Sequence, residues 1–107
     1  MSFLPFLEVD VRENEFQANV IRRLKREFSC VVIKQDPEYM QGIPDLLILC
    51  GDRWAMLEVK ASEDAPDRPN QPYYISMFNE MSFARFIYPE NEDEVFNELQ
   101  LALQPRR

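Results

Sequence analysis

Three charged residues lie at the ends of two strongly apolar segments, "DLLILC" (45–50) and "WAMLEVKA" (54–61). Asp45 begins the first segment, while Glu58 and Lys60 lie near the end of the second. Charged side chains avoid protein interiors unless they are paired or bound to a metal ion. The pattern indicates either a salt-bridged edge of a sheet or a site that binds a cation.

The turn between the two segments decides whether these residues can meet. If both segments are strands of one hairpin, alternation places Glu58 and Lys60 on the same face. A two-residue turn at 51–52 pairs Asp45 with Glu58, whereas one at 52–53 pairs Asp45 with Lys60. A regular three-residue turn puts Asp45 on the opposite face. We therefore expect an even-numbered turn or a bulge.

Two neighbouring carboxylates repel each other unless one is protonated or a cation lies between them. Mg²⁺, or Mn²⁺ in its place, takes oxygen ligands and is commonly held by one or two carboxylates together with water. The backbone carbonyl of Val59 is a further candidate ligand. Lys60 beside such a metal would help to deprotonate a bound water and would stabilise negative charge that develops on a phosphate.

The composition excludes several other kinds of chemistry. The chain has no histidine, which excludes Ser-His and Cys-His nucleophile pairs and histidine-ligated zinc. Two glycines are too few for a phosphate-binding P-loop or a dinucleotide fingerprint. The two cysteines, Cys30 and Cys50, each lie in an apolar run, which favours reduced, buried thiols over a disulfide framework.

The net charge of −7 argues against broad affinity for nucleic acid, but the charge is unevenly distributed. Residues 1–60 carry a net charge of −2 and residues 61–107 a net charge of −5. The run "RRLKR" (22–26) is either the solvated face of a helix or a contact surface for a phosphate backbone. Our candidates for DNA contact are Arg22, Arg23, Arg26 and Lys34.

The elements needed to position these residues can be read from the hydrophobic pattern. We expect one α/β domain over residues 1–107, with the element order α-β-β-β-α-β-α. The expected helices are 13–28, beginning at Glu13 or Asn14, then 71–81 and 89–104, and the expected strands are 30–35, 45–50, 54–61 and 83–88. No apolar run is long enough to span a membrane, and no leader peptide is evident, so we expect an intracellular, cytoplasmic protein, in a bacterium or in the host cell of a virus.

Four segments together resemble a known family. "PDLLIL" followed by "LEVK" resembles the PD-(D/E)xK nuclease signature. The wider pattern resembles the VRR-NUC branch: E-x-x-F-Q-x-x-V-I-x-x-L from Glu13 to Leu24, then "QGIPDLLI", then "LEVKAS", and then a polar loop that ends at Gln71. The resemblance covers most of residues 13–100. It implies a restriction-endonuclease-like mixed sheet flanked by helices.

The resemblance also implies roles for individual residues. It makes Asp45 and Glu58 metal ligands, Lys60 the catalytic lysine and Gln71 an accessory glutamine. The family also uses an acid on the first helix, and helical geometry favours Glu13 over Glu15, because Glu13 shares the face of Phe16, Val20 and Leu24 whereas Glu15 shares a face of arginines.

By the same resemblance we expect a Mg²⁺- or Mn²⁺-dependent endonuclease. It would act as a homodimer on branched DNA such as four-way junctions. The sequence departs from the family in its acidity and in "MSF" (81–83), where a glycine is common. Two alternatives remain open: a non-catalytic acidic protein that mimics DNA and inhibits a DNA-binding enzyme, and an inactive nuclease fold that serves as a binding module.

Overall fold

The computed structural model describes the backbone of residues 4–104 and the side chains from residue 11 onward. The chain is a mixed α/β protein, the class expected from the sequence. Its elements are α1 (Leu4–Glu27), β1 (Val31–Lys34), β2 (Leu46–Cys50), β3 (Arg53–Val59), α2 (Gln71–Met81), β4 (Ala84–Ile87), the 3₁₀ turn η1 (Pro89–Asn91) and α3 (Glu92–Leu103).

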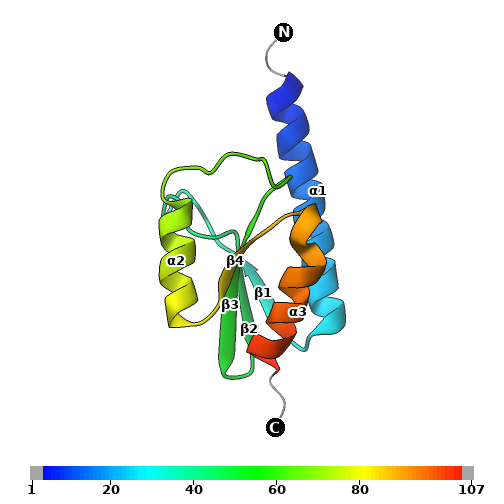
Figure 1. Ribbon diagram of the computed structural model, residues 1–107, viewed down its shortest axis with the longest axis vertical. Coiled ribbons are helices and arrows are strands. Elements are labelled where there is room, and N and C mark those ends of the chain that lie inside the picture. The colour runs from blue at the N-terminus through cyan, green and yellow to red at the C-terminus, as the bar shows by residue number, and fades with distance from the viewer. Residues whose placement is uncertain (1–3, 105–107) are drawn as a thin grey trace.

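The four strands form one sheet in the order β1-β2-β3-β4. The first three strands are antiparallel neighbours, while β4 runs parallel to β3. A parallel neighbour requires a crossover connection, and α2 provides it. Helices α1 and α3 lie on one face of the sheet and α2 lies on the other (Figure 1).

The main hydrophobic core fills the space between the sheet and the α1–α3 face. Alternation along β2 directs Leu46 and Ile48 into it, both of them fully buried. Burial of this apolar surface is the main force that holds the layers together. The helices contribute one apolar side each, comprising Phe16, Val20, Leu24 and Phe28 from α1 and Val95, Phe96, Leu99 and Leu103 from α3.

Helix α1 begins nine residues or more before the expected start. It begins at Leu4, so the start at Glu13 or Asn14 is wrong. The reason lies in the sequence: Pro5 falls in the first helical turn, where its missing N–H is harmless, and neither proline nor glycine follows it before the helix ends. The first turns of α1 extend beyond the sheet (Figure 1).

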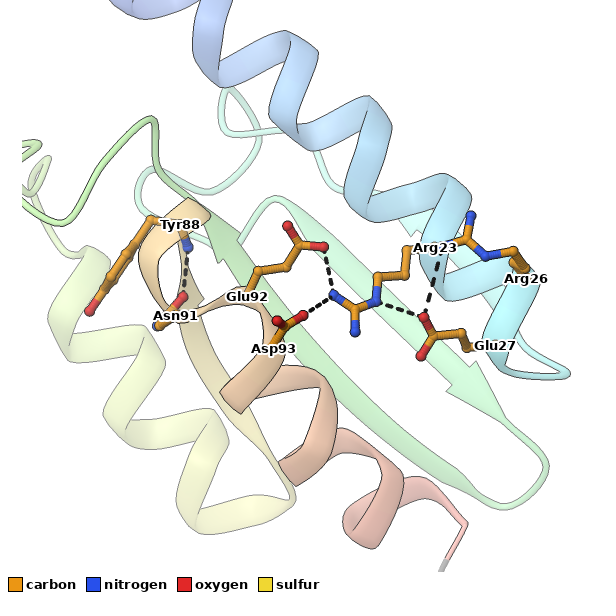
Figure 2. Close-up of polar contacts among 7 residues, drawn as sticks. All are labelled: Arg23, Arg26, Glu27, Tyr88, Asn91, Glu92 and Asp93. Carbon is orange, nitrogen blue, oxygen red and sulfur yellow. Dashed lines mark hydrogen bonds and ion pairs between the residues drawn. The ribbon is translucent and has the colours of Figure 1, made fainter.

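A charged cluster joins α1 to α3 on the side of the molecule shown in Figure 2. Arg23 donates to Glu92 and to Asp93, each at 2.8 Å, and to Glu27 at 2.6 Å. Its guanidinium also lies 4.1 Å from the centre of the Phe96 ring. Burial opposes the charge, but the three carboxylates outweigh it and raise the pKa of Arg23. Arg23, expected to contact DNA, is thus engaged in holding the two helices together.

The helix expected over 89–104 begins with the 3₁₀ turn η1, and regular α-helix starts only at Glu92. Asn91 stabilises this entry by accepting a hydrogen bond from the Tyr88 backbone N–H at 2.9 Å (Figure 2). Both cysteines are free, as expected, with Cys50 buried and Cys30 half-buried. Among the described residues, no helix is long and apolar enough to cross a membrane.

Strands β2 and β3 are joined by a two-residue turn at Gly51 and Asp52, since Cys50 pairs with Arg53. Gly51 has φ 64°, a left-handed conformation that suits glycine at the first position of a type II′ turn. The register then runs to Leu46 opposite Leu57. The expectation of an even-numbered turn is confirmed, and the next pair along the ladder is Asp45 with Glu58.

Two loops lie against each other beyond this end of the hairpin. Gly42, in the loop before β2, has φ 89° and packs against the backbone of Pro69 and Asn70, which precede α2. A Cβ atom at Gly42 would lie 2.6 Å from the Pro69 carbonyl oxygen and 2.6 Å from the Asn70 Cβ. Asn70 also donates to the Gln41 carbonyl oxygen at 3.4 Å. The close approach of the two loops therefore requires glycine at position 42.

We predict that Gly42→Ala is clearly more destabilising than Gly51→Ala. Both glycines have positive φ, so each substitution carries a conformational cost of about 1 to 2 kcal/mol. Only the Cβ at position 42 meets other atoms; none lies within 4 Å at position 51. Urea unfolding measures the difference, and equal losses of unfolding free energy in the two variants would show that the loops are free to separate.

Candidate active site

The register of the hairpin places two carboxyl groups side by side at the end of β2 and β3. Glu58 Oε1 accepts a hydrogen bond from the Asp45 backbone N–H at 3.2 Å. Asp45 Oδ2 in turn accepts one from the Val59 backbone N–H at 2.9 Å. Each carboxyl group is therefore positioned by the backbone of the opposite strand. Glu58 is almost fully buried and Asp45 is half-buried.

Gln71 connects this pair to α2. It is the first residue of that helix, is buried, and donates from Nε2 to Glu58 Oε2 at 2.7 Å. Its Oε1 accepts a hydrogen bond from the Arg68 backbone N–H at 2.8 Å. The amide thus fixes the second oxygen of Glu58 and orders the loop that precedes the helix. The expected place of Gln71 at the head of the second helix is confirmed.

The two carboxyl groups face a pocket of about 290 Å³. Its walls come from the loop before β2, the ends of β2 and β3, and the loop before α2. The described residues that line it are Pro37, Glu38, Gln41, Gly42, Ile43, Asp45, Glu58, Arg68, Pro69 and Gln71. A buried and a half-buried acid that line one pocket, held by backbone and amide hydrogen bonds, form a candidate active site.

The environment of the pair favours a bound proton or cation. Burial, followed by the charge of Asp45 and that of Glu13, raises the pKa of Glu58 to about 9. Burial also raises the pKa of Asp45, although the Val59 N–H acts in the opposite direction. Two adjacent carboxyl groups with raised pKa values cannot both ionise unless a positive charge compensates them.

A divalent cation that prefers oxygen fits this pair on chemical grounds. Asp45 and Glu58 provide hard oxygen donors from rigid strands, and Mg²⁺ or Mn²⁺ needs no more than one or two carboxylates if water completes its shell. The fit has a limit: within residues 11–104, no group of three or more acidic or cysteine side chains could hold a metal ion. The role of the Val59 carbonyl stays a prediction.

Lys60 follows β3 and is buried, but its ammonium group does not line the pocket. It donates to the Ala65 carbonyl oxygen at 2.8 Å and forms an ion pair with Asp67. The ammonium also lies 4.8 Å from the centre of the Phe86 ring. Lys60 therefore follows Glu58 by two residues along the chain, but its ammonium group is bound by the loop of residues 61–70.

Glu13 reaches the edge of the site from α1. Its side chain is half-buried and forms an ion pair with Arg68 at 3.4 Å. Its charge contributes to the raised pKa of Glu58. Glu15, by contrast, is exposed. Glu13 is thus the half-buried acid of the two, and its role as the helix-borne acid of the site stays a prediction. Within residues 11–104, it does not join Asp45 and Glu58 in one metal-binding group.

The remaining cations proposed for DNA contact occupy different surroundings. Arg22 and Arg26 are exposed on α1, where Arg22 donates to Asn19 and Arg26 lies 3.9 Å from Glu27. Lys34 ends β1 and is exposed, and its charge acts to lower the pKa of Asp45. Lys34 thus lies at the same end of the sheet as the candidate site, opposite Leu46 on the neighbouring strand.

Two residues that sequence reasoning did not select support or line the site. Gln35 holds the backbone on which Asp45 lies: its backbone N–H donates to the Asp45 carbonyl oxygen at 2.8 Å and its Nε2 donates to the Pro44 carbonyl oxygen at 3.0 Å. Arg68 lines the pocket. For Arg68, the one indication in the sequence is its position three residues before Gln71. The sequence gives no indication for Gln35, because only the fold brings it to its partners.

Comparisons with known proteins add no relatives. A scan against models of protein families matches none of them, and a search of the curated proteins finds no significant match. The function of this site must therefore be argued from its own geometry.

We predict that the protein without metal becomes less stable as pH rises from 5.5 to 8, and that Glu58→Gln removes most of this dependence. The pKa of Glu58 rises from an ordinary 4.5 to about 9 on folding, so the folded state binds more protons within that interval. The contribution of Glu58 to stability is then greatest below pH 4.5 and is lost towards pH 9, by at most about 1.4 kcal/mol per pH unit.

Urea unfolding in EDTA at several pH values measures this slope. The interval is informative because the chain has no histidine to titrate within it. Glu15→Gln, at an exposed position on α1, is the matched control and should keep the slope of the unaltered protein. A flat profile for the unaltered protein, or equal slopes in both variants, would contradict a buried, protonated Glu58.

Proposed function

We propose that the protein is a metal-dependent endonuclease that hydrolyses phosphodiester bonds of DNA, on a restriction-endonuclease-like arrangement of a mixed sheet and flanking helices. The observation that carries the proposal is the pair of Asp45 and Glu58, placed side by side by the hairpin at the base of a pocket and supported by Gln71. Oxygen-rich acidic pairs of this kind are typical of sites that hold Mg²⁺ for phosphoryl chemistry.

In this proposal the side chains of the protein position the cation and stabilise negative charge on the phosphate. A bound Mg²⁺ or Mn²⁺ would supply an activated water and offset negative charge on the phosphate. Asp45 and Glu58 would hold the cation, and the Val59 N–H and Gln71 would keep their oxygens oriented. Lys60 would stabilise charge on the reacting phosphate, which requires its ammonium group to exchange Asp67 for the substrate.

The substrate part of the proposal is branched DNA, such as a four-way junction, and it derives from the family resemblance alone. Exposed Arg22 and Arg26 on α1 and Lys34 beside the site offer contacts for a phosphate backbone. Arg23 is not included, because three carboxylates already bind it. A cation at the acidic pair would further reduce the repulsion between DNA and this acidic chain.

The proposed active form is a homodimer. Strand β1 is an open edge of the sheet, and it carries the exposed apolar side chains of Val31 and Ile33, with Leu49 exposed beside them on β2. An edge of this kind pairs readily with another chain. A two-fold dimer would present two sites, which suits paired cuts in a junction of symmetric strands.

A second candidate function is a nuclease-like fold that binds without cutting. It is favoured by the engagement of Lys60 with Asp67 and by the lack of a three-acid metal group within residues 11–104. An acidic DNA mimic is less favoured by the structure. Such a mimic needs acids spread across its surface, whereas Glu58 is buried and Asp45 is half-buried.

We predict that the purified chain cuts labelled four-way junction DNA in Mg²⁺ or Mn²⁺, and that Lys60→Ala and Asp45→Asn each lower the single-turnover rate at least about a hundredfold, as loss of one charge-stabilising group typically does. Arg53→Ala, at the exposed end of β3 away from Glu58, should leave the rate unchanged. Flap and linear duplex DNA rank the substrates. A folded protein that cuts none of them with either metal would favour the binding module.

A junction extruded from a supercoiled plasmid reports on the dimer in the same assay. Two sites acting in one encounter convert the circle directly to linear DNA, whereas a single site produces nicked circles first. Nicked circles as the accumulating product, at every protein concentration, would contradict the dimer and leave the nuclease in place.

A further inference from the structure

Arg68 lies in the loop before α2 and lines the same pocket as the acidic pair. Of the ten described residues that line this pocket, it is the one with a positively charged side chain. The side chain is 61% exposed, so its guanidinium is accessible from solvent. Arg68, Asp45 and Glu58 all line this one pocket, which brings the guanidinium and the two carboxyl groups to the same cavity.

The loop holds Arg68 at the pocket through several contacts. The backbone N–H of Arg68 donates to Gln71 Oε1 at 2.8 Å, and the same Gln71 binds Glu58. The next residue, Pro69, lies against Gly42 in the opposite wall. The guanidinium itself pairs with Glu13 at 3.4 Å. This ion pair is long and joins a largely exposed guanidinium to a half-buried carboxylate, so a phosphate can compete with Glu13 for the guanidinium.

The charges around the pocket show why a cation is needed there. Glu38, Asp45 and Glu58 are the acidic residues that line it. Lys60 is held by Asp67 and the Ala65 carbonyl oxygen outside the pocket. A phosphodiester that approaches the carboxyl pair therefore meets Arg68 as the one positively charged side chain among the described residues of the pocket wall. Guanidinium groups bind two phosphate oxygens at once with matching geometry, which an ammonium group cannot do.

We propose that Arg68 is the phosphate-binding residue of this site, and that it grips the non-bridging oxygens of a phosphate group while a divalent cation at Asp45 and Glu58 holds the other side. The ion pair with Glu13 positions the guanidinium before the phosphate binds. This inference rests on the proposed function, since it assigns the residue that recognises the phosphate of the nucleic-acid substrate at that same pocket.

The test is calorimetric binding of thymidine 3′,5′-bisphosphate in the presence of Ca²⁺, which supplies the cation without turnover. Arg68→Ala should weaken binding about tenfold to a hundredfold, the loss typical of a charge-assisted hydrogen-bonded contact. The affinity of Arg68→Lys should lie between those of the unaltered protein and Arg68→Ala, because lysine keeps the positive charge but cannot bind two phosphate oxygens with the guanidinium geometry. Arg53→Ala is the matched control: Arg53 is exposed at the opposite end of β3 from Glu58, and binding should stay within about twofold.

Each result separates this inference from the nuclease proposal. Binding by Arg68→Ala within about twofold of the unaltered protein would overturn the role of Arg68, and so would the absence of binding by the unaltered protein with Ca²⁺. If binding depends on Arg68 but no DNA is cut, the phosphate site stands and the nuclease fails. If DNA is cut equally with and without Arg68, the nuclease stands and this inference fails. Unfolding curves for each variant confirm that the variants are folded.

Discussion

The rest of this structure depends on one constraint: two carboxyl groups lie side by side at a pocket, where Glu58 is buried and Asp45 is half-buried. Water stabilises ionised acids, and burial removes that stabilisation, so Asp45 and Glu58 have raised pKa values. The arrangement is stable only while a proton or a cation offsets the charge. Backbone and amide hydrogen bonds hold the two carboxyl groups in place, which is the preorganisation that the proposed cation site requires.

The remaining elements serve to hold that geometry. The two-residue turn sets the register that brings the acids together, and α2 delivers Gln71 to Glu58 from the other face of the sheet. The contact of Gly42 with Pro69 closes the two loops that wall the pocket. On the face opposite α2, the apolar core packs α1 and α3 against the sheet. The cluster around Arg23 joins these two helices to each other (Figure 2).

Local rules predicted much of this from sequence. Turn parity limited the partner of Asp45 to Glu58 or Lys60, and the segment with Pro72 in its first turn indicated the helix at 71–81, because both depend on neighbours along the chain. Long-range partners were not accessible in the same way. Nothing in "RRLKR" shows that Arg23 meets two acids about 70 residues away, and nothing near Lys60 shows that Asp67 captures it. The role of Arg68 likewise depends on loops that meet only in the fold.

Asp45 and Glu58 are proposed to bind a divalent cation, and calorimetry at pH 7.5 measures the binding of Mn²⁺ to this pair. We expect one Mn²⁺ per chain, with release of about one proton measured in buffers of different ionisation enthalpy, because Glu58 is protonated before the metal binds. Asp45→Asn should abolish binding, whereas Glu15→Gln, on the exposed face of α1, should not change it. Absence of Mn²⁺ binding, or binding that Asp45→Asn leaves intact, would contradict the account.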